Sequence, residues 1–270
     1  MEQKKLTIAA QLYTVTQQIQ TPEGIERAFA RIHQEGYLAA QASGLGPIAA
    51  EQLRDIAQKY QVEICCTHSD FDRMQTELDK LIQEHRIYGC HNIGIGMMPH
   101  EYRGSLEGYH AFMKIVEPIA KRVADAGMQL TYHNHSFEFI KYEGRTLMDR
   151  MLEDACKELH FILDTYWIQA GGAEPAEYIR KADGRMEVCH FKDMTIVTDP
   201  ANEICGVSQH YAPVGSGNLD FKKILKACAE TGVRYAAIEQ DDCYGADPFD
   251  CLALSRKNTL ELANGIVDVR

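Results

Sequence analysis

Residues 131–139 combine several side chains that bind metals or carry protons. The stretch reads TYHNHSFEF and holds two histidines, His133 and His135, together with Glu138. Imidazole titrates near neutral pH and is a common metal ligand, so this cluster suits proton transfer or coordination of a divalent ion. Because the stretch follows an apolar run, we expect it at the end of a strand.

Other apolar runs end in the same kind of residue. These are Gln11, Tyr13 and His68 in the first third of the chain, and Asp164, His190 and Glu239 in the rest. One such residue alone is more often a helix cap or hydrogen-bonded structure than a ligand. Carboxylates gathered from several strands need a compensating charge, which a divalent cation supplies. Carboxylates with an imidazole suit Mn²⁺, Mg²⁺, Co²⁺ or Zn²⁺. Of these ions we expect Mn²⁺ first.

The elements that must position these residues alternate between strands and helices. Mostly continuous apolar runs read as parallel strands covered on both faces. They span residues 6–12, 37–42, 62–68, 92–97, 128–133, 160–164, 186–191 and 235–239. Amphipathic helices lie between them. One opens with a Thr21 cap and Pro22, and glycines at 36, 89, 127 and 232 are placed to end helices.

Eight units of about 30 residues in one chain of this length predict a (β/α)8 TIM barrel. No Pro- or Ser-rich linker divides the chain, so we expect one domain over residues 1–270. A doubly wound open sheet competes, but it would need a Gly-rich phosphate loop after the first strand, and QLYTVTQQ offers none. The longest irregular stretch is expected at residues 194–219, and its GSGNLDF segment favours a turn and helix cap over a phosphate loop.

Composition excludes several classes of protein. Of 270 residues, 45% are apolar and 25% charged, as in ordinary globular proteins, and the net charge of −11 disfavours nucleic acid as a partner. No apolar run is long enough to span a membrane, and the start MEQKKLTIAA does not read as a signal peptide. Nine cysteines without a Cys-x-x-Cys pair indicate reduced thiols and a cytoplasmic location, with Cys65 and Cys66 as core residues.

Read together, the strand-end motifs resemble those of the xylose isomerase-like TIM barrels. This superfamily, of the AP endonuclease family 2 type, includes sugar phosphate isomerases and epimerases, ketose 3-epimerases, inosose dehydratases and endonuclease IV. The motifs are QLYTV from Gln11, YHNHSFEF from Tyr132, LDTYW from Leu163, CHFKD from Cys189, GSGNLDF from Gly215 and IEQDD from Ile238.

The resemblance implies a metal ion held by one residue from each of four strands. These are Glu138, Asp164, His190 and Glu239. The ketose epimerases carry their first glutamate directly on the strand end, where this chain has His133, so the first ligand stays open between Glu138 and His133. Trp167 stands where the epimerases place a histidine, and we expect its indole to form an apolar wall or a sugar-stacking face.

Groups that move protons must lie near the ion without being tied up by it. His135 and His133 are the first candidates, and Glu239 or Glu138 could act as a base while bound. Lys192 lies two residues after His190 and would steady an enolate or a substrate oxygen. On the opposite side of the barrel mouth, substrate hydroxyls would contact Tyr13, Gln11 and His68.

These residues predict a divalent-metal-dependent isomerase or epimerase acting on a small carbohydrate. It would remove a proton next to a carbonyl, with the ion stabilising the enediolate. The alternative is a dehydratase or lyase on a keto-sugar, 3-keto-glycoside or inosose. More distant alternatives are an endonuclease IV-like nuclease and a non-catalytic sugar-binding barrel. Pairing into a homodimer through surface helices is left open.

Overall fold

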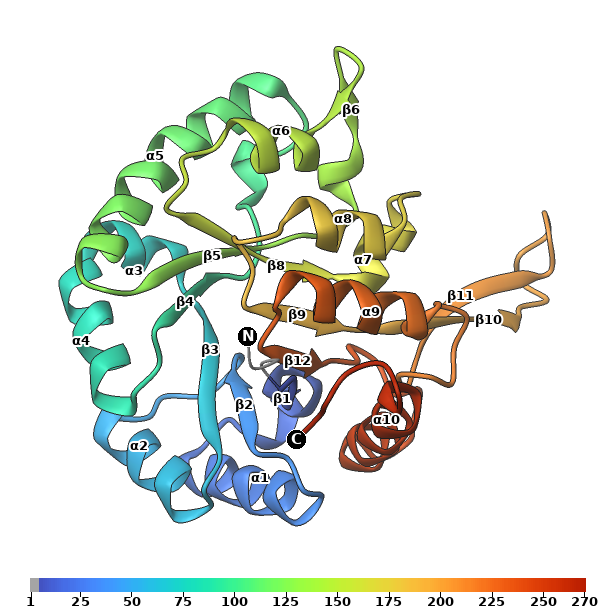
Figure 1. Ribbon diagram of the computed structural model, residues 1–270, viewed down its shortest axis with the longest axis horizontal. Coiled ribbons are helices and arrows are strands. Elements are labelled where there is room, and N and C mark those ends of the chain that lie inside the picture. Colours follow the sequence, from blue (N-terminus) through green and yellow to red (C-terminus); the bar gives the residue numbers. More distant parts are fainter. Residues whose placement is uncertain (1–4) are drawn as a thin grey trace.

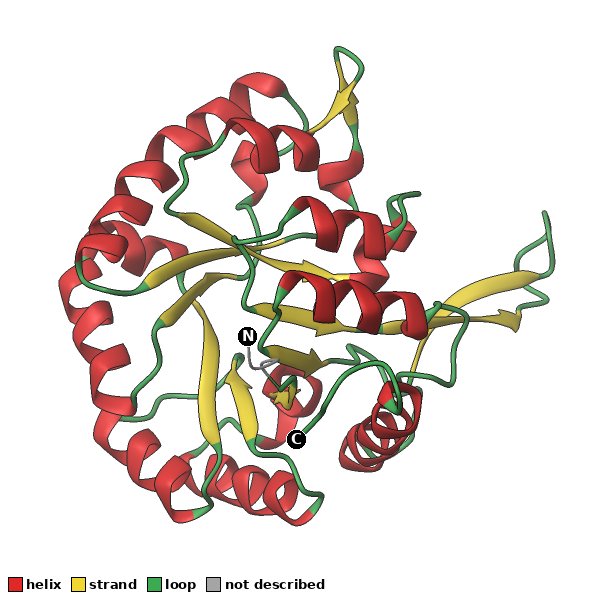
Figure 2. Ribbon diagram, viewed as in Figure 1, coloured by secondary structure: helices red, strands yellow, loops and turns green. Residues whose placement is uncertain are grey.

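The computed structural model describes residues 5–270, and within that range eight parallel strands close into a barrel surrounded by helices (Figures 1 and 2). Around the ring the strands follow the order β1-β12-β9-β8-β5-β4-β3-β2. They are β1 (Thr7–Gln11), β2 (Ala39–Ala42), β3 (Glu63–Ser69), β4 (Asn92–Ile95), β5 (Gln129–His133), β8 (Leu159–Asp164), β9 (Val188–Phe191) and β12 (Tyr235–Ile238). Each corresponds to one of the eight apolar runs, so the predicted TIM barrel is confirmed.

Helices connect the strands on the outside of the barrel (Figure 2). They are η1 (Leu12–Gln18), α1 (Pro22–Gln34), α2 (Ala50–Lys59), α3 (Phe71–Thr76), α4 (Leu78–Tyr88), η2 (His100–Tyr102), α5 (Leu106–Asp125), η3 (Phe137–Phe139), α6 (Leu147–Asp154), α7 (Thr165–Ala170), α8 (Pro175–Lys181), α9 (Phe221–Thr231) and α10 (Pro248–Ala263). As predicted, the Thr21 side chain caps α1 by accepting from the Gly24 N–H. Within residues 5–270, no helix has both the length and the apolar character needed to cross a membrane.

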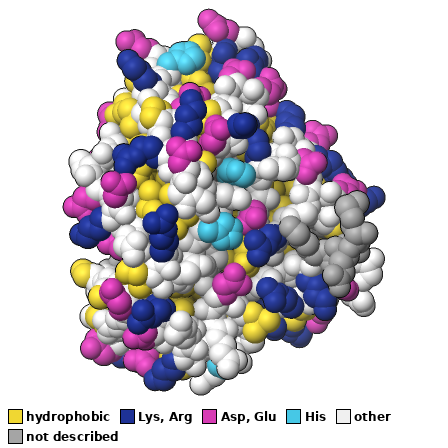
Figure 3. Space-filling view, turned by 60° about the vertical axis from the view of Figure 1, so that its left-hand side comes forward, with side chains coloured by type: hydrophobic (Ala, Val, Ile, Leu, Met, Phe, Trp, Pro, Cys, Tyr) yellow, Lys and Arg dark blue, Asp and Glu magenta, His cyan; other side chains and the backbone are white. Residues whose placement is uncertain are grey.

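The glycines expected to end helices have the backbone conformation that this role requires. Their φ angles lie between 70° and 86°, a region that costs glycine little because it has no Cβ. They are Gly36, Gly89, Gly127 and Gly232. On the outer surface, basic and acidic side chains are interspersed over the face in Figure 3.

The inside of the barrel is filled by small and medium side chains from alternate strand positions. A separate buried cluster contains Ala9, Ala39, Ala237 and Cys66, whereas the larger core between strands and helices contains side chains such as Phe112. The prediction that Cys65 and Cys66 are core residues is confirmed, since both are buried. Because strand side chains alternate between faces, the residue two positions after each inner residue also faces inward, one layer nearer the carboxyl ends.

A long antiparallel hairpin interrupts the alternation of strands and helices. It consists of β10 (Asp193–Thr198) and β11 (Val207–Ala212) and projects away from the barrel (Figure 1). The stretch expected to be irregular, residues 194–219, therefore contains two paired strands at 194–198 and 207–212 and is irregular in the rest of its length. Four consecutive β-branched residues, 195–198, favour a strand. The two strands lie outside the barrel and mix polar with apolar residues, so they lack the continuous apolar run that marks a barrel strand. A smaller hairpin joins β6 (Lys141–Tyr142) to β7 (Arg145–Thr146).

Candidate metal centre

Four buried side chains meet at the carboxyl end of the barrel. They are His133, Asp164, His190 and Glu239, and one ligand atom from each lies within 4.8 Å of the others. Three of them stand two positions after inner residues of the barrel, as Asp164 follows Ile162. The strand pairing adds to this, because Asp164 lies opposite His190 in the register of β8 and β9. The closed sheet thus places groups from distant parts of the sequence at one point.

Each imidazole in this cluster has one nitrogen held by a carbonyl oxygen and the other facing a carboxylate. His133 Nδ1 lies 3.0 Å from the Gly96 carbonyl oxygen, which fixes it as the donor, and Nε2 lies 3.3 Å from Asp164 Oδ2. His190 Nε2 lies 2.8 Å from Gln41 Oε1, and Nδ1 lies 3.1 Å from Glu239 Oε2. Metal-bound histidines are usually oriented in this manner by an outer hydrogen bond.

The electrostatics of the cluster depend on a balance of buried charges. Burial opposes ionisation of Asp164 and Glu239, yet the Lys192 ammonium and the neighbouring imidazoles hold the pKa of both carboxyls below its ordinary range. The same carboxylates overcome burial at His190 and raise its pKa to about 9. Two carboxylates and two imidazoles, all buried and convergent, suit a divalent cation, which would replace the His190 proton.

Of the two residues left open as the first ligand, His133 belongs to this cluster and Glu138 does not. The Glu138 side chain is buried and accepts hydrogen bonds from the Tyr132 hydroxyl at 2.5 Å and the His135 N–H at 2.8 Å. Burial raises its pKa to about 7. It lies on η3, where the chain has already turned away from the strand. His133 stands two positions after Thr131 on β5 and therefore faces the inside of the barrel. This spacing is the sequence signal that would have placed it in the cluster.

Lys192 is buried between carboxylates at the edge of the cluster. Its Nζ lies 2.8 Å from Asp241 Oδ1, 3.1 Å from Glu239 Oε2 and 3.6 Å from Asp164 Oδ2. The ammonium also lies 5.2 Å from the centre of the Trp167 ring. Asp241 was not predicted, although its position two residues after Glu239 was the available signal. Gln41 and Asn134 were likewise given no role; Asn134 Oδ1 accepts from the Asp164 N–H at 2.9 Å.

The cluster opens into a cavity of about 580 Å³ at the barrel mouth. Its lining consists of Tyr13, Ser43, Gly44, His68, Ser69, Asp70, Phe71, Ile95, Gly96, Met97, His133, His135, Trp167, Lys192, Glu239 and Asp241. The predicted contact residues Tyr13, His68, Trp167 and Lys192 are among them. Gln11 is not, because it is buried and its Oε1 accepts from the Tyr13 N–H at the start of η1.

Two further histidines in the cavity are held neutral. Burial lowers the pKa of His135 to about 3 and that of His68 well below its ordinary value, with His133 adding to both effects. The His135 ring packs edge-on against His133 at 4.8 Å and lies 5.2 Å from Trp167. Room for His68 depends on Gly96, where a Cβ would lie 3.1 Å from the ring nitrogen Nδ1. The second glycine of the NIGIGM segment therefore serves to make space for the His68 ring.

The GSGNLDF segment forms a turn around a carboxylate. Asp193 accepts backbone N–H bonds from Gly215 at 2.9 Å, Gly217 at 3.0 Å and Leu219 at 3.2 Å. A Cβ at Gly217 would lie 2.5 Å from Asp193 Oδ1, so glycine is required there. Asp220 then caps α9. The predicted turn and helix cap are confirmed.

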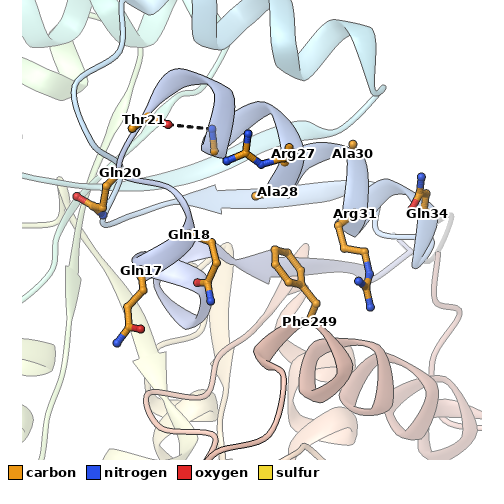
Figure 4. A pocket seen from close by; sticks show the side chains of 11 residues that line it. Gln17, Gln18, Gln20, Thr21, Arg27, Ala28, Ala30, Arg31, Gln34 and Phe249 are labelled. Atoms are coloured by element: carbon orange, nitrogen blue, oxygen red, sulfur yellow. Dashed lines mark hydrogen bonds between the residues drawn. The ribbon is translucent and has the colours of Figure 1, made fainter.

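A second hollow, of about 600 Å³, lies between η1, α1 and the start of α10 (Figure 4). Glutamine and arginine side chains line most of it, including Gln17, Gln18, Arg27 and Arg31, with Phe249 from α10. It shares no residue with the cavity at the barrel mouth, and its described lining contains no histidine, cysteine or carboxylate. Histidine and carboxylate side chains line the cavity at the barrel mouth instead.

Comparison with known proteins gives consistent results. A sequence profile of the family described as xylose isomerase-like TIM barrel matches residues 23–243. An inosose dehydratase from Clostridium botulinum (strain Alaska E43 / Type E3) is 26% identical over 175 residues, which are 61% of this chain and 58% of that protein. The chain thus spans a little over half of that relative. The rhizopine catabolism protein MocC of Rhizobium meliloti is 21% identical over 267 residues, 88% of this chain and 82% of that protein.

Among solved structures, a sugar phosphate isomerase/epimerase from Parabacteroides distasonis ATCC 8503 has the same fold. It superposes with a TM-score of 0.73 at 20% sequence identity and covers 99% of this chain and 96% of its own. At 20% sequence identity this match shows that the two proteins share the barrel fold, and it shows nothing about activity.

Proposed function

Because the chain belongs to the xylose isomerase-like TIM barrel family, we propose that it is a divalent-metal-dependent isomerase or epimerase of a sugar or sugar derivative. The observation that carries the proposal is the buried cluster of His133, Asp164, His190 and Glu239, which opens into the cavity at the barrel mouth. These four residues would hold the ion. When bound, the ion would supply positive charge that stabilises a substrate oxygen becoming negative.

Other residues of the chain would move the proton and fix the substrate. His135 is neutral, lines the cavity and has no hydrogen-bond partner at Nδ1 among the described residues, so in the tautomer that carries its proton on Nε2 this nitrogen could accept a substrate proton. The Lys192 ammonium lines the same cavity and would pair with the oxygen that gains charge. Trp167 offers an indole face to the apolar side of a sugar ring. Glu138 does not line the cavity, so we assign it to holding the His135 backbone.

A dehydratase is the second candidate, because a relative with that name resembles this chain and the first chemical step would be the same. The inosose dehydratase shares 26% identity with this chain, and dehydration begins with the same proton removal next to a carbonyl. The residues of the cluster serve both reactions. The difference lies in whether a leaving group departs after the proton is lost.

The proposal is tested by metal content and by hydrogen exchange. The purified protein should bind one divalent ion, and Asp164→Ala should lose it while keeping its helical circular dichroism. Keto-sugars incubated with the metal-loaded protein in deuterated water should gain deuterium at the carbon next to the carbonyl. His135→Ala should keep the ion and lose exchange, whereas His110→Ala, at an exposed position of α5, should keep both.

Retention of the formula during exchange identifies an isomerase or epimerase, and loss of water identifies the dehydratase. A protein that binds no divalent ion, or that exchanges equally well without one, would refute the proposal.

A further inference from the structure

In TIM barrels phosphate commonly binds to particular loops, and in this chain carboxylate side chains occupy those loops. Phosphate groups are frequently held by the loops after the seventh and eighth barrel strands. The seventh strand here is β9, and the loop that returns from its hairpin to α9 donates three backbone N–H groups to Asp193. A fourth N–H, from Met194, reaches the same carboxylate at 2.8 Å. The donors that would surround a phosphate are already engaged.

The loop after the eighth strand, β12, likewise presents acidic groups. Asp241 lines the cavity and holds Lys192 at 2.8 Å, and Asp242 accepts from the Tyr244 N–H at 2.7 Å. Tyr244 has a φ of 49°, an uncommon conformation for a residue with a side chain, and its hydroxyl accepts from the Tyr211 N–H at 3.0 Å. These contacts fix the loop with its carboxylates in place.

The charges that line the cavity would repel a phosphate ester. Among the described lining residues, Lys192 is the one lysine or arginine, and Asp241 and Glu239 already pair with it. On the other side of the cavity, Asp70 accepts the N–H groups of Asp72 and Arg73 at the start of α3. A phosphate dianion in the cavity would therefore face carboxylates, and the ammonium of Lys192 that could bind it is already paired with two of them.

What the cavity does offer is a set of neutral polar atoms. His68 Nε2, His135 Nδ1 and Trp167 Nε1 are buried and have no hydrogen-bond partner among the described residues. All three residues line the cavity. A buried polar atom without a partner is costly, and hydroxyl or carbonyl groups of a ligand would satisfy these three.

We infer that the cavity takes an uncharged, unphosphorylated polyhydroxy ketone, and that Asp70 and Asp241 reject phosphate esters of the same compounds. This inference rests on the proposed function, because the reacting carbonyl must reach the cluster. It narrows the substrate class of that site, and it separates this chain from any relative that acts on a sugar phosphate.

The test compares matched pairs of ligands: a ketopentose with its 5-phosphate and a ketohexose with its 6-phosphate. The phosphate lies far from the carbonyl in each ester, which limits direct contact with the metal. Titration calorimetry on the metal-loaded protein should show the neutral member binding roughly tenfold or more tightly. Asp70→Asn and Asp241→Asn should each lower the ratio of the two affinities, neutral ketone over phosphate ester, about threefold or more, because each removes a negative charge that repels the phosphate. Asparagine at position 70 can still cap α3.

The control is Asp79→Asn on α4, whose side chain is 88% exposed, and it should leave the ratio unchanged. Phosphate esters that bind as tightly as the neutral ketones, or tighter, would overturn the inference, as would binding of neither. Selective binding of neutral ketones without deuterium exchange would keep the inference and refute the proposed reaction.

Discussion

The buried carboxyl of Glu138 should make the stability of the fold depend on pH. Its pKa is raised from 4.5 to about 7 by burial, so the folded protein retains a proton that the unfolded chain releases. The folded state then binds more protons between these two values, and stability falls as the pH rises through that window. The full shift corresponds to about 3 kcal/mol, of which roughly 2 kcal/mol is lost between pH 5 and pH 8.

Glu138→Gln isolates this effect because glutamine keeps the shape and cannot ionise. Its amide oxygen can still accept from the His135 N–H, and its NH₂ group can donate to the Tyr132 hydroxyl. Urea unfolding of the metal-free protein at pH 5 and pH 8 should show the variant gaining about 2 kcal/mol relative to wild type at the higher pH. Glu203→Gln, at an exposed position of the hairpin loop, should show no such gain. A difference between wild type and Glu138→Gln that is the same at both pH values would refute the reasoning.

Three further results follow from the same geometry. His133→Ala should weaken binding of a divalent ion about 100-fold or more in a competition assay with a chelating dye, whereas Glu138→Gln should change it less than threefold. Affinity for the ion should rise with pH up to about 9, since binding displaces the proton of His190, and calorimetry in buffers of different ionisation enthalpy should detect that proton. Gly217→Ala should lower the free energy of unfolding by about 1–3 kcal/mol, because its Cβ would meet Asp193 at 2.5 Å; an unchanged melting temperature would contradict this.

The barrel could be predicted from sequence because its strands are short apolar runs between helices that end in glycine. Of the residues predicted at the strand ends, Asp164, His190 and Glu239 come together as expected. Strand register pairs Asp164 with His190, and Glu239 directly follows the last paired residue of β12. Whether His133 or Glu138 joins the cluster depends on where the chain turns after β5. The spacing of apolar residues in the sequence does not predict the position of such a turn.

Lys192 and Asp241 show a second limit of the sequence. Each stands two residues after a cluster member, but both lie beyond the last paired residue of their strands. The alternation of side chains is guaranteed only while the strand continues. Their ion pair at 2.8 Å is a contact between two loops, which only the coordinates could reveal.

Asp193 fixes both ends of the long hairpin to the barrel. It pairs with Ala212 across the base of the hairpin and holds the loop that leads into α9. The chain between these anchor points, from Thr198 to Val207, is therefore free to change in length or sequence without moving Lys192. This makes the hairpin tip the natural place to graft a peptide tag or a fluorescent label when the site has to stay intact.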